Sequence, residues 1–245
     1  LSLGRPGGQD EGPWTNVPLA DYVQRGIAPE HAHDLLRMAH DPLFDVADEP
    51  ACYAPIHACR ALGVLGAVEA IPRLVSLMHR MVRHDDDYGL EDMPVVFACM
   101  GPRAIDPLVR ALRDQREPFG VRLYLCDALE RIALKHSGAR DPVVAQFTSM
   151  LGYARYTDPG LNGHIIGSLI ELSAAESLPA IAATYHAGFV DEQCCGSLAQ
   201  VEGEIVLSAE ERRATRAARL APILARYEAE ERAMGALAYE GSRRT

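Results

Sequence analysis

The stretch IHACRALGVLGAVEAIPRLVSLM, residues 56–78, decides the fold. Its apolar residues recur at steps of three and four, which is the spacing of one face of an α-helix. Gly66 interrupts the pattern, and Pro72 stands where it resumes, at a place that suits the first turn of a helix. The stretch therefore predicts two short helices that are joined by a turn at Gly66.

The same setting of a proline recurs three more times. Pro107 stands in AIDPLVRAL, Pro142 in ARDPVVAQF and Pro179 in ESLPAIAAT, at successive steps of 35, 35 and 37 residues from Pro72. A unit of two helices with that period is typical of helical repeat arrays. The chain is therefore predicted to repeat one helical hairpin four times.

Residues at fixed distances from each proline are apolar in the four copies. Fourteen positions before stand Ala58, Met93, Ala128 and Ile165; ten before, Leu62, Phe97, Ile132 and Leu169; two after, Leu74, Val109, Val144 and Ile181; five after, Leu77, Leu112, Phe147 and the polar Thr184. The first two sets are four residues apart, so they share one face of a first helix. The last two sets are three apart and share one face of a second helix.

The residue at the turn differs among the copies. Gly66 and Gly101 stand there in the first two, whereas His136 and Ser173 stand at the same position in the other two. Glycine adopts positive backbone φ angles without strain, and other residues do not. We therefore expect the turns at His136 and Ser173 to be longer.

Less regular segments flank the repeats. Residues 1–16 are predicted to be a flexible arm, 17–53 N-terminal capping helices, 54–187 the four repeats, and 188–245 an irregular segment with a C-terminal capping helix. Residues 188–207 match no clear helical pattern. The text SAEE at 208–211 matches a capping box, and predicts a helix that runs to about Met234 with a kink at Pro222.

The text ALGVLGAVEAIPRLVSLM, residues 61–78, resembles a HEAT repeat of the phycobilisome-lyase-like type, usually A-L-G-x-I-G-x-x-x-A-I-P-x-L-x-x-x-L. Residues 54–82 match well, 88–116 fairly, and 121–152 and 161–187 loosely, so the resemblance covers about half of the chain. It implies an all-α, right-handed α-solenoid of HEAT-like helical hairpins, with about four clear repeats and irregular capping helices. It implies little about activity, because such repeats mostly serve as binding scaffolds, and it does not imply bilin chemistry.

Composition narrows the class of partner. The chain has 245 residues, a formal net charge of −10 and a pI of about 5.4, whereas a protein that coats nucleic acid needs a basic face. It has no apolar run long enough to span a membrane and no signal-peptide pattern at its start. Its six cysteines lack the dense spacing of a secreted disulfide scaffold. These features predict a cytoplasmic protein that is not associated with a membrane, and they disfavour nucleic acid as a partner.

A row of arginines marks the second helices of the first two copies, and we call it the basic row. It consists of Arg73, Arg80 and Arg83 in one copy and Arg110, Arg113 and Arg116 in the next. In HEAT-like arrays the second helices line the concave face, so stacking would place these side chains in a groove for an acidic peptide or protein. The alternative is that they are ordinary solvated residues paired with Asp114 and Glu117.

Three further clusters have simpler structural explanations than a functional one. Cys194 and Cys195 are adjacent, but their acidic neighbours raise a thiol pKa rather than lower it, so a redox, metal or nucleophilic role ranks below a place in a loop. HAHD at 31–34 does not put its histidines on one helical face, as a zinc site requires. HDDD at 84–87 lacks the ligand order of an EF-hand. The sequence therefore predicts no catalytic residue, no cofactor and no metal.

Together these features favour a non-catalytic protein-binding scaffold or adaptor that uses the concave face of a solenoid. One alternative is a HEAT-like DNA glycosylase or another nucleic-acid-processing enzyme, which would need a basic groove. A bilin lyase or a chaperone is a weaker alternative that follows from the family resemblance alone. An inhibitor that blocks one enzyme would be a special case of the scaffold, and the acidic surface of this chain would suit a basic enzyme.

Overall fold

The structure, a computed structural model, describes residues 22–242. Every regular element in that part of the chain is a helix, so the predicted all-α class is confirmed. Within the same residues, no helix has both the length and the apolar character that crossing a membrane requires. The predicted flexible arm, residues 1–16, lies outside the described residues.

The N-terminal part of the described chain consists of short elements. They are η2 (Pro29–His31), α1 (Ala32–His40), η3 (Pro42–Val46) and η4 (Ala51–Tyr53). Tyr22 precedes them and is fully buried, and its hydroxyl hydrogen-bonds with Nδ1 of His57 at 2.9 Å. Because α1 packs along the next helix, this segment covers one end of the core.

Four helical hairpins follow. The first helices are α2 (Ala54–Val64), α4 (Asp87–Met100), α6 (Phe119–Lys135) and α8 (Pro159–Glu171), and the second helices are α3 (Ile71–Arg83), α5 (Ile105–Arg113), α7 (Arg140–Leu151) and α9 (Leu178–His186). The short turns η5 (Val68–Ala70), η6 (Pro102–Ala104) and η8 (Ala175–Ser177) precede α3, α5 and α9, and η7 (Ala154–Tyr156) precedes α8. Each anchor proline is the second or third residue of its helix, where its missing N–H has no intrahelical partner. The predicted position of all four prolines is confirmed.

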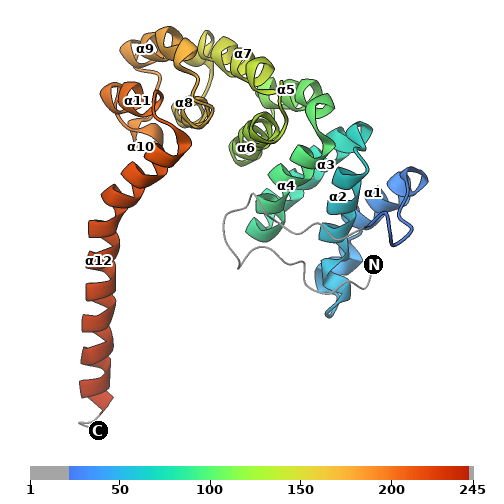
Figure 1. The fold of residues 1–245 in the computed structure, drawn as a ribbon. Coiled ribbons are helices and arrows are strands. Elements are labelled where there is room, and N and C mark those ends of the chain that lie inside the picture. Colours follow the sequence, from blue (N-terminus) through green and yellow to red (C-terminus); the bar gives the residue numbers. More distant parts are fainter. Residues whose placement is uncertain (1–21, 243–245) are drawn as a thin grey trace.

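The hairpins stack in two layers. First helices pack on first helices, from α2 through α4 and α6 to α8, and second helices pack on second helices, from α3 through α5 and α7 to α9. In Figure 1 the layers form an arc with the first helices on its inner side and the second helices on its outer side. The predicted placement of the second helices on the concave side was therefore wrong.

Close packing of the first helices explains the direction of the curve. A Cβ atom on Gly63 of α2 would lie 2.6 Å from the carbonyl oxygen of Val96 in α4, so the two backbones nearly touch there. The first helices also contact one another along more of their length than the second helices do. The layer with the closer spacing becomes the shorter, inner side of the arc.

The core lies between the two layers. All twelve residues of the three apolar sets are buried, and so are Leu77, Leu112 and Phe147 of the fourth set. Thr184 is buried as well, and its hydroxyl donates to the carbonyl of Ala180 at 2.8 Å. This bond avoids the cost of burying a hydroxyl without a partner. The core predicted from the repeat is therefore confirmed.

A buried ion pair joins the first two hairpins. Arg60 of α2 is 1% exposed and Asp92 of α4 is 2% exposed. The Arg60 guanidinium donates to the Asp92 carboxylate through Nε at 2.9 Å and through Nη2 at 2.7 Å. A two-pronged pair of this kind satisfies both charges away from water.

The turns at His136 and Ser173 are no longer than the turns at the two glycines. Residues 65–70 and 172–177 separate the helices of the first and fourth hairpins, and residues 101–104 and 136–139 those of the other two. Ser173 adopts a positive φ of 50° at the position of Gly66, and its Oγ accepts a hydrogen bond from Arg212 at 2.9 Å. In the third hairpin Gly138 supplies the positive φ. The expectation of longer turns was therefore wrong. Arg212 of α12 holds Ser173 in its positive-φ conformation, and in the third hairpin Gly138, two positions after His136, takes the place of a glycine at the turn.

Residues 188–207 contain two short helices, α10 (Glu192–Cys195) and α11 (Leu198–Glu204), so the expected absence of a helix was wrong. α10 packs on α8 and α11 on α9, and Val201 and Ile205 are fully buried. Helices of one or two turns are too short to show a periodic pattern, and they are stabilised by packing.

The last helix, α12 (Ala209–Ser242), begins as predicted. The backbone N–H of Ser208 donates to Glu211 Oε2 at 2.8 Å, and the N–H of Glu211 donates to Ser208 Oγ at 3.2 Å. The helix continues through Pro222 to Ser242, the last residue that the structure describes, and so passes the predicted end at Met234. It extends away from the two layers (Figure 1).

Candidate functional site

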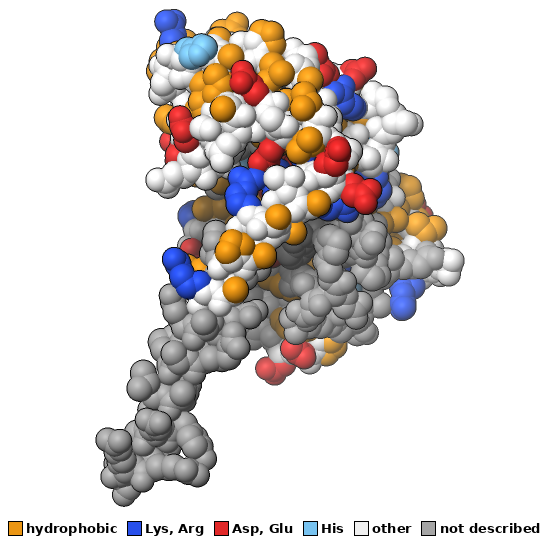
Figure 2. All heavy atoms as spheres, turned by 60° about the vertical axis from the view of Figure 1, so that its left-hand side comes forward, with side chains coloured by type: hydrophobic (Ala, Val, Ile, Leu, Met, Phe, Trp, Pro, Cys, Tyr) orange, Lys and Arg blue, Asp and Glu red, His pale blue; other side chains and the backbone are white. Residues whose placement is uncertain are grey.

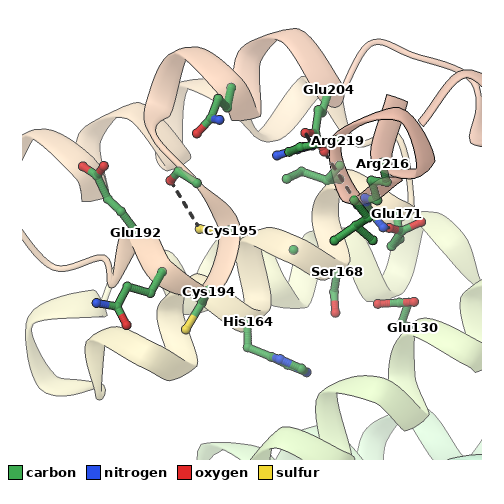
Figure 3. Close-up of a pocket in the computed structure, with 16 residues that line it drawn as sticks. Glu130, His164, Ser168, Glu171, Glu192, Cys194, Cys195, Glu204, Arg216 and Arg219 are labelled. Atoms are coloured by element: carbon green, nitrogen blue, oxygen red, sulfur yellow. Dashed lines mark hydrogen bonds and ion pairs between the residues drawn. The ribbon is translucent and has the colours of Figure 1, made fainter. Parts of the chain in front are cut away.

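A cavity of about 530 Å³ opens where the inner layer meets α10, α11 and the first turns of α12. Figure 3 shows Glu130 of α6 together with His164 and Ser168 of α8 on one part of the wall. Glu171, Glu204, Arg216 and Arg219 gather on another part. On the face in Figure 2 acidic and basic side chains are interspersed among the coloured residues, so this face does not carry charge of one sign.

Glu130 has a strongly shifted acidity. Burial raises the pKa of Glu130 to about 7, and the hydrogen bond from Ser168 and the charge of His164 only partly oppose this rise, to which Asp127 and Glu171 also contribute. A carboxyl in this environment changes its charge near neutral pH. A nearby charge on a bound partner would therefore change the protonation of Glu130.

His164 is paired with Asp127 across the α6–α8 contact. Its Nε2 lies 2.7 Å from Oδ1 of Asp127. Burial lowers the pKa of His164, but the hydrogen bond and the charge of Asp127 outweigh burial, so the pKa is raised overall. The hydrogen bond between the imidazole and the carboxylate therefore joins the two helices beside Glu130.

The two adjacent cysteines line the same cavity. Burial raises the pKa of both Cys194 and Cys195. Asp191 and Asp158 raise it further at Cys194, and Glu192 and Asp191 do so at Cys195. The Tyr185 hydroxyl lies 3.1 Å from the sulfur of Cys195. Both thiols stay protonated at neutral pH, and a protonated thiol is a poor nucleophile.

Ion pairs fasten α12 to the body at this cavity. Arg212 is 2% exposed and donates to the Glu171 carbonyl at 2.9 Å. Arg216 pairs with Glu171 and Arg219 pairs with Glu204. These arginines are engaged with groups of the same chain and support the structure of the junction.

A groove beside the cavity runs along α4 and α6, and we call its surface the inner strip. Its members are Glu91 of α4 and Tyr124, Asp127, Glu130 and Leu134 of α6. The groove encloses about 530 Å³, with Val95 and Ala98 as apolar lining and the cations Arg131 and Lys135 in its wall beside Asp127 and Glu130. Leu134 is 59% exposed. Burial raises the pKa of Tyr124, and the charges of Glu91, Asp87 and Asp127 raise it further, so three carboxylates act on this side chain.

The basic row lies on α3, on α5 and just after α5, so it belongs to the outer layer and does not form the predicted concave groove. Arg80 donates to the carbonyls of Ala39 and His40 at 3.2 and 2.9 Å, and thereby caps the end of α1. Arg83 donates to the carbonyl of His79 in its own helix. These two side chains are engaged within the chain.

The remaining members of the basic row are exposed at separate places. Arg116 makes a two-pronged pair with Asp114, as one reading of the sequence proposed, while Glu117 binds His79 instead. Arg113 reaches α7, and Arg73 and Arg110 are exposed. The predicted binding role of the row stays a prediction.

Two other sequence clusters have structural roles. In HAHD, Nδ1 of His31 accepts a hydrogen bond from the N–H of Ala28 at 2.9 Å. In HDDD, the Asp86 side chain accepts from the N–H of Gly89 at 2.9 Å and caps the start of α4. Among the described residues, no group of three or more His, Cys, Asp or Glu side chains is arranged to hold a metal ion.

Sequence reasoning missed the inner strip. Asp127 and His164 are 37 residues apart, and nothing in the local text of either helix relates them. The repeat pattern identifies the buried faces of α4 and α6, but it does not show which polar residues face the inside of the arc. A search for carboxylates at non-core positions of the first helices could have found them.

The inner face carries side chains of both charges and an exposed leucine. The thiols of Cys194 and Cys195, in the cavity beside it, have raised pKa values and are protonated at neutral pH. Comparison with protein-family models, with curated proteins and with solved structures finds no match for this chain.

Proposed function

We propose that this protein is a non-catalytic binding scaffold, an α-solenoid of HEAT-like hairpins whose inner strip receives a segment of a partner protein. Support for the solenoid comes from the four hairpins with equivalent prolines and from the separate stacking of first and second helices. The observation that carries the binding role is the exposed Leu134, which lines a groove on the inner layer together with Asp127 and Glu130 and with the cations Arg131 and Lys135.

The inner strip favours a basic partner over the acidic peptide expected from the basic row. Glu91 and Glu130 would attract arginine or lysine side chains, and Leu134 would contact an apolar residue between them. Arg131 and Lys135 of the same groove would meet the carbonyl groups or acidic side chains of the partner segment. The same carboxylates would repel phosphates, which disfavours the DNA glycosylase alternative. No observation favours a bilin lyase or a chaperone.

Fluorescence anisotropy with a labelled amphipathic peptide of leucine, alanine and arginine tests this proposal. The double variant Glu91→Gln, Leu134→Ala removes one carboxylate and one apolar contact of the inner strip. We expect it to bind the peptide at least about tenfold more weakly than the wild type, as loss of central contacts usually does.

The matched control is Asp106→Asn, Leu43→Ala, which removes one exposed carboxylate and one exposed leucine outside the inner strip. We expect this control to bind like the wild type, and we expect a peptide with glutamate in place of arginine not to bind. Equal affinities for the two double variants would show that the peptide does not use the inner strip. Circular dichroism checks that each variant is folded.

A further inference from the structure

A separate, smaller cavity lies between two successive connections of the array. It encloses about 210 Å³ between the loop that follows α5 and the loop that follows α7. Arg113 and Gln115 line it from the first loop and the end of α5, and Tyr153 and Tyr156 from the second. Arg122, from the first turn of α6, forms part of its wall.

Arg122 is a buried cation without a carboxylate partner among the described residues. It is 8% exposed, and its Nε donates to the Leu112 carbonyl at 2.9 Å. The carboxylates whose charge it feels are Asp114 and Asp158. Asp114 is engaged by Arg116, and Asp158 caps the start of α8 through the N–H of Gly160. Buried arginines are normally paired with an acid, so Arg122 has an unmet charge.

Arg113 adds a second guanidinium to the cavity. Its Nη2 donates to Gln146 Oε1 at 3.0 Å and to Ser149 Oγ at 3.3 Å, and both acceptors are neutral. These contacts orient the side chain of Arg113 without neutralising it. Two positive charges therefore line a space that is large enough for a small anion.

Aromatic side chains are held at the rim. Tyr153 is 64% exposed and Tyr156 is 57% exposed. The guanidinium carbon of Arg155 lies 4.3 Å from the ring centre of Tyr156, and Gln115 donates to the Tyr156 carbonyl at 3.2 Å. The ring of Tyr156 is held by Arg155, and both exposed rings offer flat surfaces to an aromatic or apolar group.

We propose that this cavity binds an oxoanion, a carboxylate or phosphate group, that is carried on an aromatic or apolar body. The guanidinium forks of Arg113 and Arg122 match the geometry of such a group. An anion there would supply the charge partner that Arg122 lacks, and the tyrosines would contact the body that carries it. This site is distinct from the inner strip, whose carboxylates suit a ligand of the opposite charge.

Isothermal titration calorimetry on the full chain tests the site with four probes. They are inorganic phosphate, phenyl phosphate, benzoate and, as the neutral control, phenol. We expect saturable binding of the three anions, tightest for phenyl phosphate, and no binding of phenol. Affinity should fall as salt is added, because screening weakens charge attraction.

Substitutions assign the binding to the cavity. Arg122→Gln and Arg113→Gln should each weaken phenyl phosphate binding at least about tenfold, as loss of a charge-assisted contact does. Arg116→Gln is the matched control, since Arg116 is an exposed, acid-paired neighbour outside the cavity lining, and it should bind like the wild type. Arg113 is exposed, so the Arg113→Gln variant is expected to fold. It therefore still tests the site if the Arg122→Gln variant does not fold.

Each outcome decides part of the proposal. No saturable binding of phosphate or phenyl phosphate, or equal affinity in the wild type and Arg113→Gln, would overturn the oxoanion site. Equal affinity for phosphate and phenyl phosphate would support the oxoanion site and overturn the contact with the tyrosines. Tighter binding of phenyl phosphate, lost in both variants, would support the whole proposal.

Discussion

At the contact between α6 and α8, two carboxyls and one imidazole come together, and none of the three residues belongs to a sequence motif. Asp127 pairs with His164, whereas Glu130, one helical turn further along α6, is largely removed from water. Burial disfavours the charged form of a carboxyl, so Glu130 changes its charge near neutral pH. At the scale of the residue, the surroundings of Glu130, and not its residue type, set its acidity.

The raised pKa of Glu130 predicts a pH-dependent stability. Since the folded state binds this proton more tightly than the unfolded state, the contribution is favourable below about pH 4.5 and is lost as pH rises to about 7. Glu130→Gln should remove this slope and should be more stable than the wild type at pH 8, by about 1–3 kcal/mol. Urea unfolding at pH 4.5 and pH 8 measures both effects.

The control for this prediction is Glu69→Gln, which changes an exposed carboxylate. Its stability should follow the wild type at both pH values. If Glu130→Gln and the wild type lose the same free energy of unfolding between pH 4.5 and pH 8, Glu130 does not have the shifted acidity described for it.

At the scale of the element, the C-terminal helix depends on one buried arginine. Arg212 reaches from the first turn of α12 into the turn between α8 and α9, where it meets Ser173 and the Glu171 carbonyl. The same contact supports the positive φ of Ser173. One side chain therefore fixes both the start of α12 and the turn that it packs against.

Arg212→Met should detach the start of α12 from the body. The change leaves the Glu171 carbonyl without its donor and should cost about 2–4 kcal/mol. Hydrogen exchange should rise in the first turns of α12 and in the α8–α9 turn. Arg213→Met is the control, because Arg213 is exposed and donates only within its own helix, to Ala209. Unchanged exchange in Arg212→Met would mean that other contacts hold the helix.

At the scale of the whole molecule, the spacing of the two layers sets the curvature. The close approach at Gly63 keeps α2 and α4 together on the inner side, and the buried Arg60–Asp92 pair joins the same two helices. The helices that carry the inner strip, α4 and α6, lie on the inner side of the arc because the first helices form the more closely spaced layer. The shape of the molecule and the position of the candidate site therefore have one cause.

Gly63→Ala should loosen this spacing. The added methyl would lie 2.6 Å from the Val96 carbonyl, so α2 and α4 must separate, at a cost of about 1–3 kcal/mol. Gly167→Ala on α8 is the control, because a Cβ there meets no atom within 4 Å, and alanine in a helix should stabilise by about 0.5–1 kcal/mol. Urea midpoints measure both, and a loss in neither variant would contradict the close approach.

The sequence by itself determined the helices and their buried faces. Pro72, Pro107, Pro142 and Pro179 mark the starts of the second helices, and the apolar sets at fixed distances from them form the core. Both features are local, because a helix start and an apolar face depend on residues within a few turns of one another. The capping box at Ser208 was readable for the same reason.

Only the tertiary structure decided which layer faces inward and which polar side chains meet. The direction of the curve depends on how closely helices from different repeats approach, and the pairing of Asp127 with His164 spans 37 positions in the chain. Among the described residues no carboxylate pairs with Arg122, because Asp114 and Asp158 are engaged elsewhere, and no local pattern in the sequence shows this. Periodicity fixes what each helix buries, whereas the charge and the position of a site come from contacts between helices that are distant in the sequence.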